Sequence, residues 1–319
     1  MELSSSKIIK DNILSNYIEY QYLFVESQSK FLSSLYFSYQ SVENGNLVMY
    51  YEKETHQDIL REKDYDLNFN ISYEKFWENH LKINPKRRSL IKIAEDTFLP
   101  KETVRRKILQ LIKKKVLGKK DKCIGWLPSE EYKKNYNLFV NEEIESVARQ
   151  INFICKKLNY FISKEEITKE LKENFSFYRF HYLGAQIKYL NLWTEQFKDS
   201  ELVLIFLQVV NLFASKAKDK NITHKNLFDN PNLFKEFITA SISATSIAEV
   251  TKIPRATCVR KLEHLVKLKM VSQDKISKRY YIIPDATADN LISQEITDKV
   301  VAIFSNLYFI CVRAIKAKA

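Results

Sequence analysis

The chain has 319 residues, of which 45% are hydrophobic and 28% are charged, and its formal net charge is +12. This balance excludes a disordered or fibrous protein, and the length favours two globular domains. Residues 1–7 lack the apolar core of a signal peptide, and the most apolar run, residues 202–214, is shorter than the roughly 18–20 residues that cross a bilayer. We therefore expect a cytoplasmic protein without a membrane partner, in which residues 202–214 form a buried helix.

Residue types that carry enzyme chemistry are scattered along the chain. The five histidines lie far apart, without a His-x-x-x-His spacing, and no Gly-x-Ser-x-Gly motif occurs. Four isolated glycines cannot build a glycine-rich loop around a phosphate. The cysteines, which form no metal-like pair, are Cys123, Cys155, Cys258 and Cys311. These patterns predict a protein that is not an enzyme and that has no cofactor and no metal site.

In chain order, the first half is predicted to be mainly helical. Apolar residues recur at helical spacing over residues 8–40 and again over residues 141–158. The segment Glu43-Asn44-Gly45-Asn46 is typical of a turn. Between these helices, residues 89–128 contain two short helical stretches, a basic turn and a final Pro128, a pattern that returns later in the chain.

The second half is predicted to repeat this order of elements. Ser163 begins a helix, and residues 176–215 are aromatic-rich and helical. Asp229-Asn230-Pro231 then breaks the chain before a second compact segment, residues 246–284. A long helix with an apolar stripe is expected over residues 289–316.

The segment 246–284 organises the interpretation. Ser246 and Glu249 have the spacing of a capping box that opens a short helix, and Pro254 ends the turn after it. The apolar stripe of the next helix is Cys258, Leu262 and Leu265. Two short apolar runs then flank the basic turn 272–279 and predict a β-hairpin. Helix, turn, helix and hairpin is the plan of a winged helix-turn-helix module.

The same pattern occurs twice, which predicts a tandem duplication. Residues 93–117 match residues 247–271 when they are shifted by 154 positions, and both hairpins end in a proline, Pro128 and Pro284. Upstream, aromatic residues 20–32 match residues 178–190 at a shift of 158. We therefore expect two repeats, residues 1–159 with a winged helix at about 85–128, and residues 160–319 with one at about 233–284.

Both segments resemble the DNA-reading helices of bacterial winged-helix regulators. Lys101-Glu102-Thr103-Val104-Arg105-Arg106 is similar to the Arg-Glu-Thr-Val-x-Arg signature of the Crp/Fnr group. An aromatic-rich helix before each module and a long helix after it resemble the MarR type. The chain departs from Crp/Fnr relatives because no β-rich cyclic-nucleotide domain precedes either module. The resemblance implies sequence-specific binding of double-stranded DNA.

Positive charge is concentrated on the two modules, as expected for a protein that binds a polyanion. Residues 85–122 hold 14 lysines and arginines against four acidic residues, and residues 247–279 hold nine against three. Most runs of charge are solvated helix faces, but the recurrence of Arg106-Lys107 as Arg260-Lys261 favours DNA contact. The candidate DNA-binding residues are Lys101, Glu102, Thr103, Arg105, Arg106, Lys107 and Lys120 in the first module, and Arg255, Thr257, Arg260, Lys261, His264, Lys278 and Arg279 in the second.

Aromatic residues crowd residues 17–39 and 177–213. They could line a pocket for a small-molecule effector or stack single-stranded bases, but helical packing is the favoured interpretation. A small-molecule effector is therefore kept as an alternative partner.

The predicted fold is mainly α, with two winged helix-turn-helix modules joined by long helices into a pseudo-two-fold helical body. The predicted function is a DNA-binding transcription regulator that acts as a monomeric, intramolecular pseudo-dimer. One alternative is a plasmid-type replication initiator, which also carries two tandem winged helices. The other is a helical scaffold that uses its winged helices for protein contacts.

Overall fold

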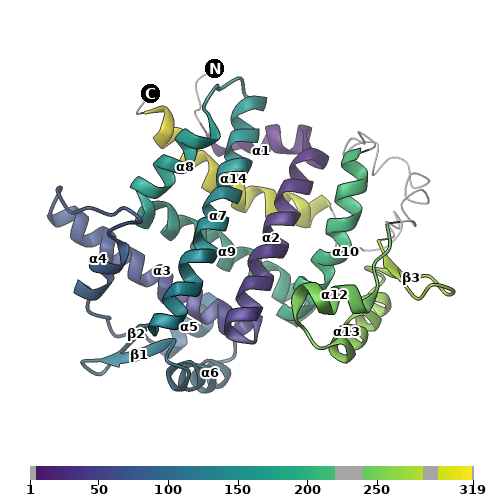
Figure 1. Cartoon of the computed structure of the whole chain (residues 1–319), viewed down its shortest axis with the longest axis horizontal. Helices are drawn as coiled ribbons and strands as arrows, with labels where there is room; N and C mark the ends of the chain where they lie inside the picture. Colours follow the sequence, from purple (N-terminus) through teal and green to yellow (C-terminus); the bar gives the residue numbers. More distant parts are fainter. Residues whose placement is uncertain (1–4, 220–239, 283–293, 318–319) are drawn as a thin grey trace.

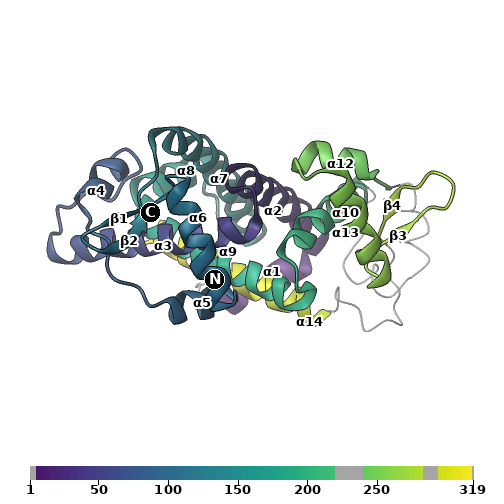
Figure 2. The same cartoon turned by 90° about the horizontal axis from the view of Figure 1, so that it is seen from below.

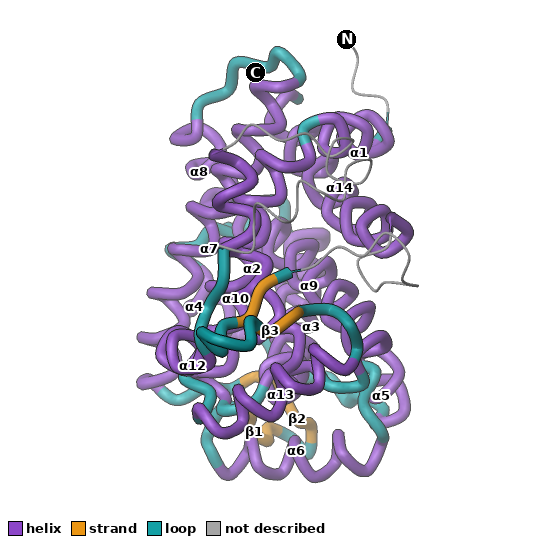
Figure 3. Tube along the Cα trace, turned by 90° about the vertical axis from the view of Figure 1, so that its right-hand side faces the viewer, coloured by secondary structure: helices purple, strands orange, loops and turns teal. Residues whose placement is uncertain are grey.

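The fold is mainly α-helical, as predicted. The computed structural model describes residues 5–219, 240–282 and 294–317, and within these it contains thirteen helices and two small antiparallel hairpins (Figure 1). The predicted break at residues 229–231 and the hairpin end at Pro284 lie outside the described residues. Viewed from below, the two hairpins lie toward opposite ends of the molecule, with long helices between them (Figure 2). Figure 3 shows how little of the chain is strand.

The first half of the chain forms seven helices and one hairpin. In order, these are α1 (Ser6–Ser15), α2 (Tyr17–Tyr39), α3 (Val42–Tyr65), α4 (Phe76–Lys82), α5 (Leu90–Thr97), α6 (Lys101–Lys113), β1 (Leu117–Lys120), β2 (Cys123–Trp126) and α7 (Glu130–Lys157). Strand β1 pairs with β2 in antiparallel register, with Leu117 opposite Trp126.

Within the described residues, the second half follows the same order of elements, without a counterpart of α4. These are α8 (Lys164–Glu173), α9 (Phe175–Phe197), α10 (Ser200–Asp219), α12 (Ala244–Thr251), α13 (Arg255–Lys267), β3 (Ser272–Gln273), β4 (Tyr280–Tyr281) and α14 (Gln294–Lys316). Helices α8 and α9 begin and end 158 residues after α1 and α2, and α12 and α13 begin and end 154 residues after α5 and α6. The two shifts are those at which the sequence matches itself.

The segment 43–46, predicted as a turn, lies inside α3, so that prediction is wrong. The chain turns three residues before Glu43, at Gln40, which has a φ of 59°, and the hydroxyl of Ser41 accepts a bond from the backbone N–H of Asn44. Gly45 serves helix packing, because a Cβ atom there would lie 3.1 Å from Cβ of Leu35 on α2. A glycine that allows two helices to approach closely has the same local sequence signal as a glycine in a turn.

The start of α12 also differs from the prediction. Its N-cap is Ser243, whose hydroxyl accepts a bond from the backbone N–H of Ser246, so Ser246 lies within the first turn and does not form the expected box with Glu249. The helix that was expected at Ser163 does begin there, and Ser163 and Glu166 form a complete capping box. Both serines stand before an acidic residue, but only one of them precedes a helix whose first turn starts at the next residue.

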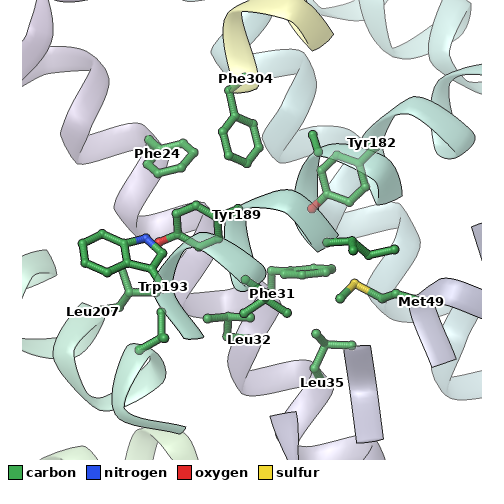
Figure 4. Packing of buried hydrophobic residues seen from close by; sticks show 14 of the residues in the cluster. Phe24, Phe31, Leu32, Leu35, Met49, Tyr182, Tyr189, Trp193, Leu207 and Phe304 are labelled. Carbon is green, nitrogen blue, oxygen red and sulfur yellow. The ribbon is translucent and has the colours of Figure 1, made fainter. Parts of the chain in front are cut away.

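Four long helices from the two halves cross in the centre of the molecule. Helix α2 packs along α10, and α9 packs along α3, while α1 contacts α14 and α7 contacts α8. Figure 4 shows the aromatic centre of this core, where Phe24 on α2 meets Phe304 on α14 with ring centroids 4.7 Å apart and Tyr189 on α9 at 5.7 Å. The prediction that these aromatic residues are packing core is confirmed for Phe24, Tyr182 and Trp193, each of which is buried.

Helix α10 is apolar because most of it is buried in this core. It is the one helix of the described residues that is long and apolar enough to cross a membrane by length and composition, over Ser200–Lys218, and 67% of that window is buried inside the protein. Leu202, Val209 and Ala214 are each less than 2% exposed. The buried helix predicted over residues 202–214 is therefore present.

A buried charge network joins α3, α7 and α9. The Nε of Arg179 on α9 donates to Oε1 of Glu52 on α3 at 2.7 Å, and its Nη1 contacts Glu143 on α7. The hydroxyl of Tyr136, also on α7, donates to the same Glu52 oxygen at 2.8 Å. Burial alone would raise the pKa of Glu52, but the guanidinium of Arg179 and the nearby His56 ring lower it to about 2. Burial raises the pKa of Glu143, so of the two carboxylates Glu52 stays ionised to the lower pH.

Replacing Glu52 with glutamine should destabilise the protein in a pH-dependent way. Folding lowers the Glu52 pKa from 4.5 to about 2, so its charge stabilises the folded state above pH 4.5, and this contribution is lost as the pH falls toward 2. Urea unfolding at neutral pH should show a loss of about 3 kcal/mol in Glu52→Gln, since a buried cation loses its partner. That difference should narrow below pH 4.5.

Glu78→Gln is the matched control, because Glu78 pairs with Lys75 on an exposed surface. It should change the unfolding free energy by less than about 1 kcal/mol. A Glu52→Gln deficit that is small at neutral pH, or that is constant from pH 7 to pH 3, would contradict the assignment of Glu52 as the ionised partner.

Candidate nucleic-acid interface

Two helix-turn-helix-hairpin segments have the same turn geometry. We call α5, α6, β1 and β2 the first segment, and α12, α13, β3 and β4 the second segment. Each turn begins with a residue in the left-handed region, Phe98 with a φ of 54° or Lys252 with a φ of 60°. A proline, Pro100 or Pro254, then directly precedes the second helix. A proline at this position presets the backbone and needs no hydrogen-bond partner for its nitrogen.

The second helix of each segment packs through three apolar residues at matching positions. On α13 these are Cys258, Leu262 and Leu265, all fully buried as predicted, and on α6 they are Val104, Ile108 and Leu111. Burial raises the pKa of the Cys258 thiol, which keeps it neutral and suits it to the apolar position that Val104 holds on α6.

The two hairpins differ at their tips. The β1–β2 tip is a tight turn through Asp121 and Lys122, which both have a positive φ. Gly125 on β2 lies so close to Pro85 that an added Cβ would be 2.5 Å from the proline ring. The second hairpin has a longer loop, in which the Asp274 carboxylate accepts bonds from the backbone of Ile276 and Ser277, and the Ile276 side chain is 94% exposed.

Helices α6 and α13 lie on the same side of the molecule, at the bottom of Figure 1, and both face the viewer in Figure 2. Most of the candidate DNA-binding residues are exposed on this side or on the hairpins; Thr103 and Thr257 are partly buried. The exposed candidates are Lys101, Glu102, Arg105, Arg106, Lys120, Arg255, Arg260, His264, Lys278 and Arg279. The segments thus expose basic side chains at matching positions.

Some of these arginines are held by neighbouring groups, and two are not. Arg105 pairs with Glu102 at 3.0 Å, and Arg255 donates to the hydroxyl of Thr245 at 3.1 Å. Arg106 and Arg260, which occupy matching positions 154 residues apart, form no hydrogen bond or ion pair within the described part of the chain. Among the candidate arginines, they are therefore the ones that are most available to an external partner.

The structure removes Lys107 and Lys261 from the exposed face, which corrects their assignment as DNA contacts. Lys107 is 9% exposed and its ammonium lies 2.9 Å from Glu43, while Lys261 is 7% exposed and lies 2.6 Å from Asp199 and 3.1 Å from Glu201. Each side chain emerges beside the buried stripe of its helix, so its stem is covered and its charge meets an acidic residue of the helical body.

Part of the positive charge around the first segment is also neutralised. The ammonium of Lys86 lies 2.8 Å from the buried Asp58, and Arg88 pairs with both Asp58 and Glu54. These acidic residues are on α3, outside the stretch in which the basic residues were counted. The field that reaches solvent is therefore weaker than the composition of residues 85–122 indicates.

Other exposed lysines in and beside the two segments were not among the candidates. They are Lys113, Lys114, Lys115, Lys119 and Lys122 in the first segment and Lys267, Lys269 and Lys275 in the second. The sequence match at a shift of 154 already pairs Lys115 with Lys269, and in the structure both residues have a left-handed backbone.

Two cavities that the described residues form near the aromatic core are small. Both lie beside Arg179 and measure about 30 Å³ each, one of them lined by Phe31, Tyr39 and Met49 among others. A site for a small-molecule effector typically needs about 300–1,000 Å³. A wider depression of about 550 Å³ between α7 and α8 is lined mainly by charged side chains. Among the described residues, no group of three His, Cys, Asp or Glu side chains is placed to hold a metal ion.

No family model, curated protein or solved structure matches this chain. The function must therefore be argued from the residues and their arrangement.

Lysine acylation tests which basic residues are accessible. Lys107 and Lys261 should react several-fold more slowly than the exposed Lys101 and Lys269, because burial and ion pairing withdraw their ammonium groups from solvent. Mass spectrometry of the folded protein after brief acetylation would give each rate, and the unfolded protein should show equal rates. Rapid modification of Lys107 or Lys261 in the folded protein would contradict their burial.

Proposed function

We propose that this protein binds double-stranded DNA through two winged helix-turn-helix modules and regulates transcription. The observation that carries the proposal is the pair of segments on one side of the molecule. Each has at the same position of its second helix an arginine, Arg106 or Arg260, that forms no hydrogen bond or ion pair with the described residues. Helices α6 and α13, which we call the reading helices, are 13 residues long. A helix of this length fits into the major groove of DNA.

The chemistry of the exposed residues supports this proposal. Arginine can donate two hydrogen bonds to the edge of guanine, and lysine, threonine and free backbone N–H groups bind phosphates. Neither reading helix has a side-chain cap at its N-terminus, so backbone N–H groups there are available to an anion. The hairpins carry exposed Lys120, Lys278 and Arg279 beside the reading helices and would contact the DNA backbone.

We further infer that the two modules arose by duplication and act as a pseudo-dimer within one chain. Three observations support this: the matching helix ends, the matching turns, and the crossed packing of α2 on α10 and of α9 on α3. A homodimeric regulator needs two chains to present two reading helices to one site. One copy of this chain would present both.

Binding should weaken steeply as salt is raised, because each neutralised phosphate releases counterions. If about 6–10 phosphates are contacted, affinity should fall by roughly 10³- to 10⁵-fold between about 50 and 200 mM salt. Fluorescence anisotropy with a duplex selected from a random pool would measure this. Lys169→Ala, on α8 at the opposite end of the molecule, is the control and should leave the slope unchanged. A partner whose binding ignores salt would favour the protein-scaffold alternative.

A binding-site selection should distinguish residues that read bases from residues that contact phosphates. Arg106→Ala and Arg260→Ala should each cost about 1–3 kcal/mol and relax the preference at one base position, whereas Lys114→Ala should weaken all sequences about equally. Three variants with the same selected site would show that the wrong face was assigned to base reading. Mapping of bound sites across a genome would distinguish promoters from a single origin of replication, which the replication-initiator alternative requires.

A further inference from the structure

A buried lysine connects each reading helix to the helical body through polar contacts. The two lysines lie at matching positions of their helices. Lys107 on α6 contacts Glu43 at 2.9 Å, Asn44 at 3.2 Å and Ser41 at 3.4 Å. Lys261 on α13 contacts Asp199 at 2.6 Å and Glu201 at 3.1 Å. We call these two clusters the lysine locks.

The acceptors of the two locks also correspond to each other. Ser41 and Asp199 are the residues directly before α3 and α10, and Glu43 and Glu201 are the second residues of these helices. Each pair is separated by 158 residues, whereas the lysines are separated by 154. Both repeats therefore build the same contact from parts of the chain that lie far apart in sequence. The N-terminus of a helix also stabilises a carboxylate through the helix dipole. The acidic residues of the locks are therefore favourably placed even without the lysine.

The locks connect each reading helix to a helix that packs against the other half of the chain. Helix α3 carries the first lock and packs along α9, and α10 carries the second lock and packs along α2. Figure 1 shows α3 beside the first segment and α10 beside the second, with α2 between them. A tilt of one reading helix relative to the body must therefore break its lock or strain the central crossing.

We propose that Lys107 and Lys261 are positioning residues that hold the two reading helices at one fixed separation and orientation, so that the protein accepts paired DNA half-sites at a single spacing. The inference rests on the proposed function for its DNA consequence, but not for its mechanical part. Two binding elements that are rigidly joined gain affinity from each other only when the spacing of their targets matches. The locks supply that rigidity without touching the DNA.

The mechanical part can be tested without DNA. Spin labels at Gln110→Cys and His264→Cys, exposed matching positions on α6 and α13, would report the distance distribution between the reading helices in a Cys123→Ser background. The other cysteines are buried. The distribution should be narrow in the parent protein and broader in Lys107→Met and Lys261→Met, which keep the unbranched stem of the side chain and lose its charged end. Lys114→Met, an exposed lysine of the first segment, is the control and should leave the distribution narrow.

The DNA part uses duplexes in which two selected half-sites are moved apart or together by one or two base pairs. Parent protein and Lys114→Met should lose roughly tenfold or more in affinity at the altered spacings. The two lock variants should lose affinity at the best spacing and show a smaller penalty at the others. Lys107→Arg and Lys261→Arg, which keep the positive charge, should restore the spacing preference.

Substitution of the acidic residues of a lock tests the same inference if a lysine variant does not fold. Asp199→Asn combined with Glu201→Gln removes the charges that hold Lys261 and should broaden the distances in the same way, with circular dichroism confirming the helical fold. Distance distributions that stay narrow in all lock variants, or variants that keep the parental spacing preference, would overturn the inference. A parent protein that binds no DNA but whose distances broaden when the locks are removed would instead overturn the proposed function.

Discussion

The contact of Phe24 with Tyr189 and Phe304 joins helices from both halves of the chain, and the placement of the two segments depends on it. These rings pack edge to face in the buried centre, where such geometry adds to the free energy of burying their apolar surface. Around them α2 packs on α10 and α9 packs on α3. Each segment is therefore carried by a helix whose main packing partner belongs to the other half, and neither segment can be placed independently of the other.

Polar pairs distinguish the two crossings of this core. In the crossing of α3 with α9, Arg179 meets Glu52, whereas the corresponding positions at a shift of 158 are Gln21 and Val210. In the crossing of α2 with α10, Ser29 and Gln208 exchange hydrogen bonds at 2.9 and 3.1 Å. A misplaced helix would leave one of these groups buried without a partner, which costs more free energy than the bond itself contributes. The pairs thus favour one register in each crossing.

Basic side chains have two separate uses in the segments. Arg106 and Arg260 are exposed and unpaired within the described residues, whereas Lys107 and Lys261, their direct neighbours in sequence, are buried in ion pairs. Neighbouring positions of a helix point about 100° apart, so one face can meet a ligand while the next holds the helix in place. Net charge counts both kinds of residue equally, and it therefore overstates how much of the positive charge is available to DNA.

Local patterns in the sequence were enough to predict the helical fold and the two compact segments. The stripe Cys258, Leu262 and Leu265, the turn before Pro254 and the cap at Ser163 each depend on residues within about one or two helical turns, where periodicity and propensity decide the conformation. The burial of Lys261 and the helical conformation of the segment 43–46 depend on distant residues instead. Lys261 is buried because Asp199, 62 positions away, supplies its partner, and Gly45 is helical because α2 approaches α3 there. Only the tertiary structure could decide such positions, since their free energy comes from groups that the local sequence does not contain.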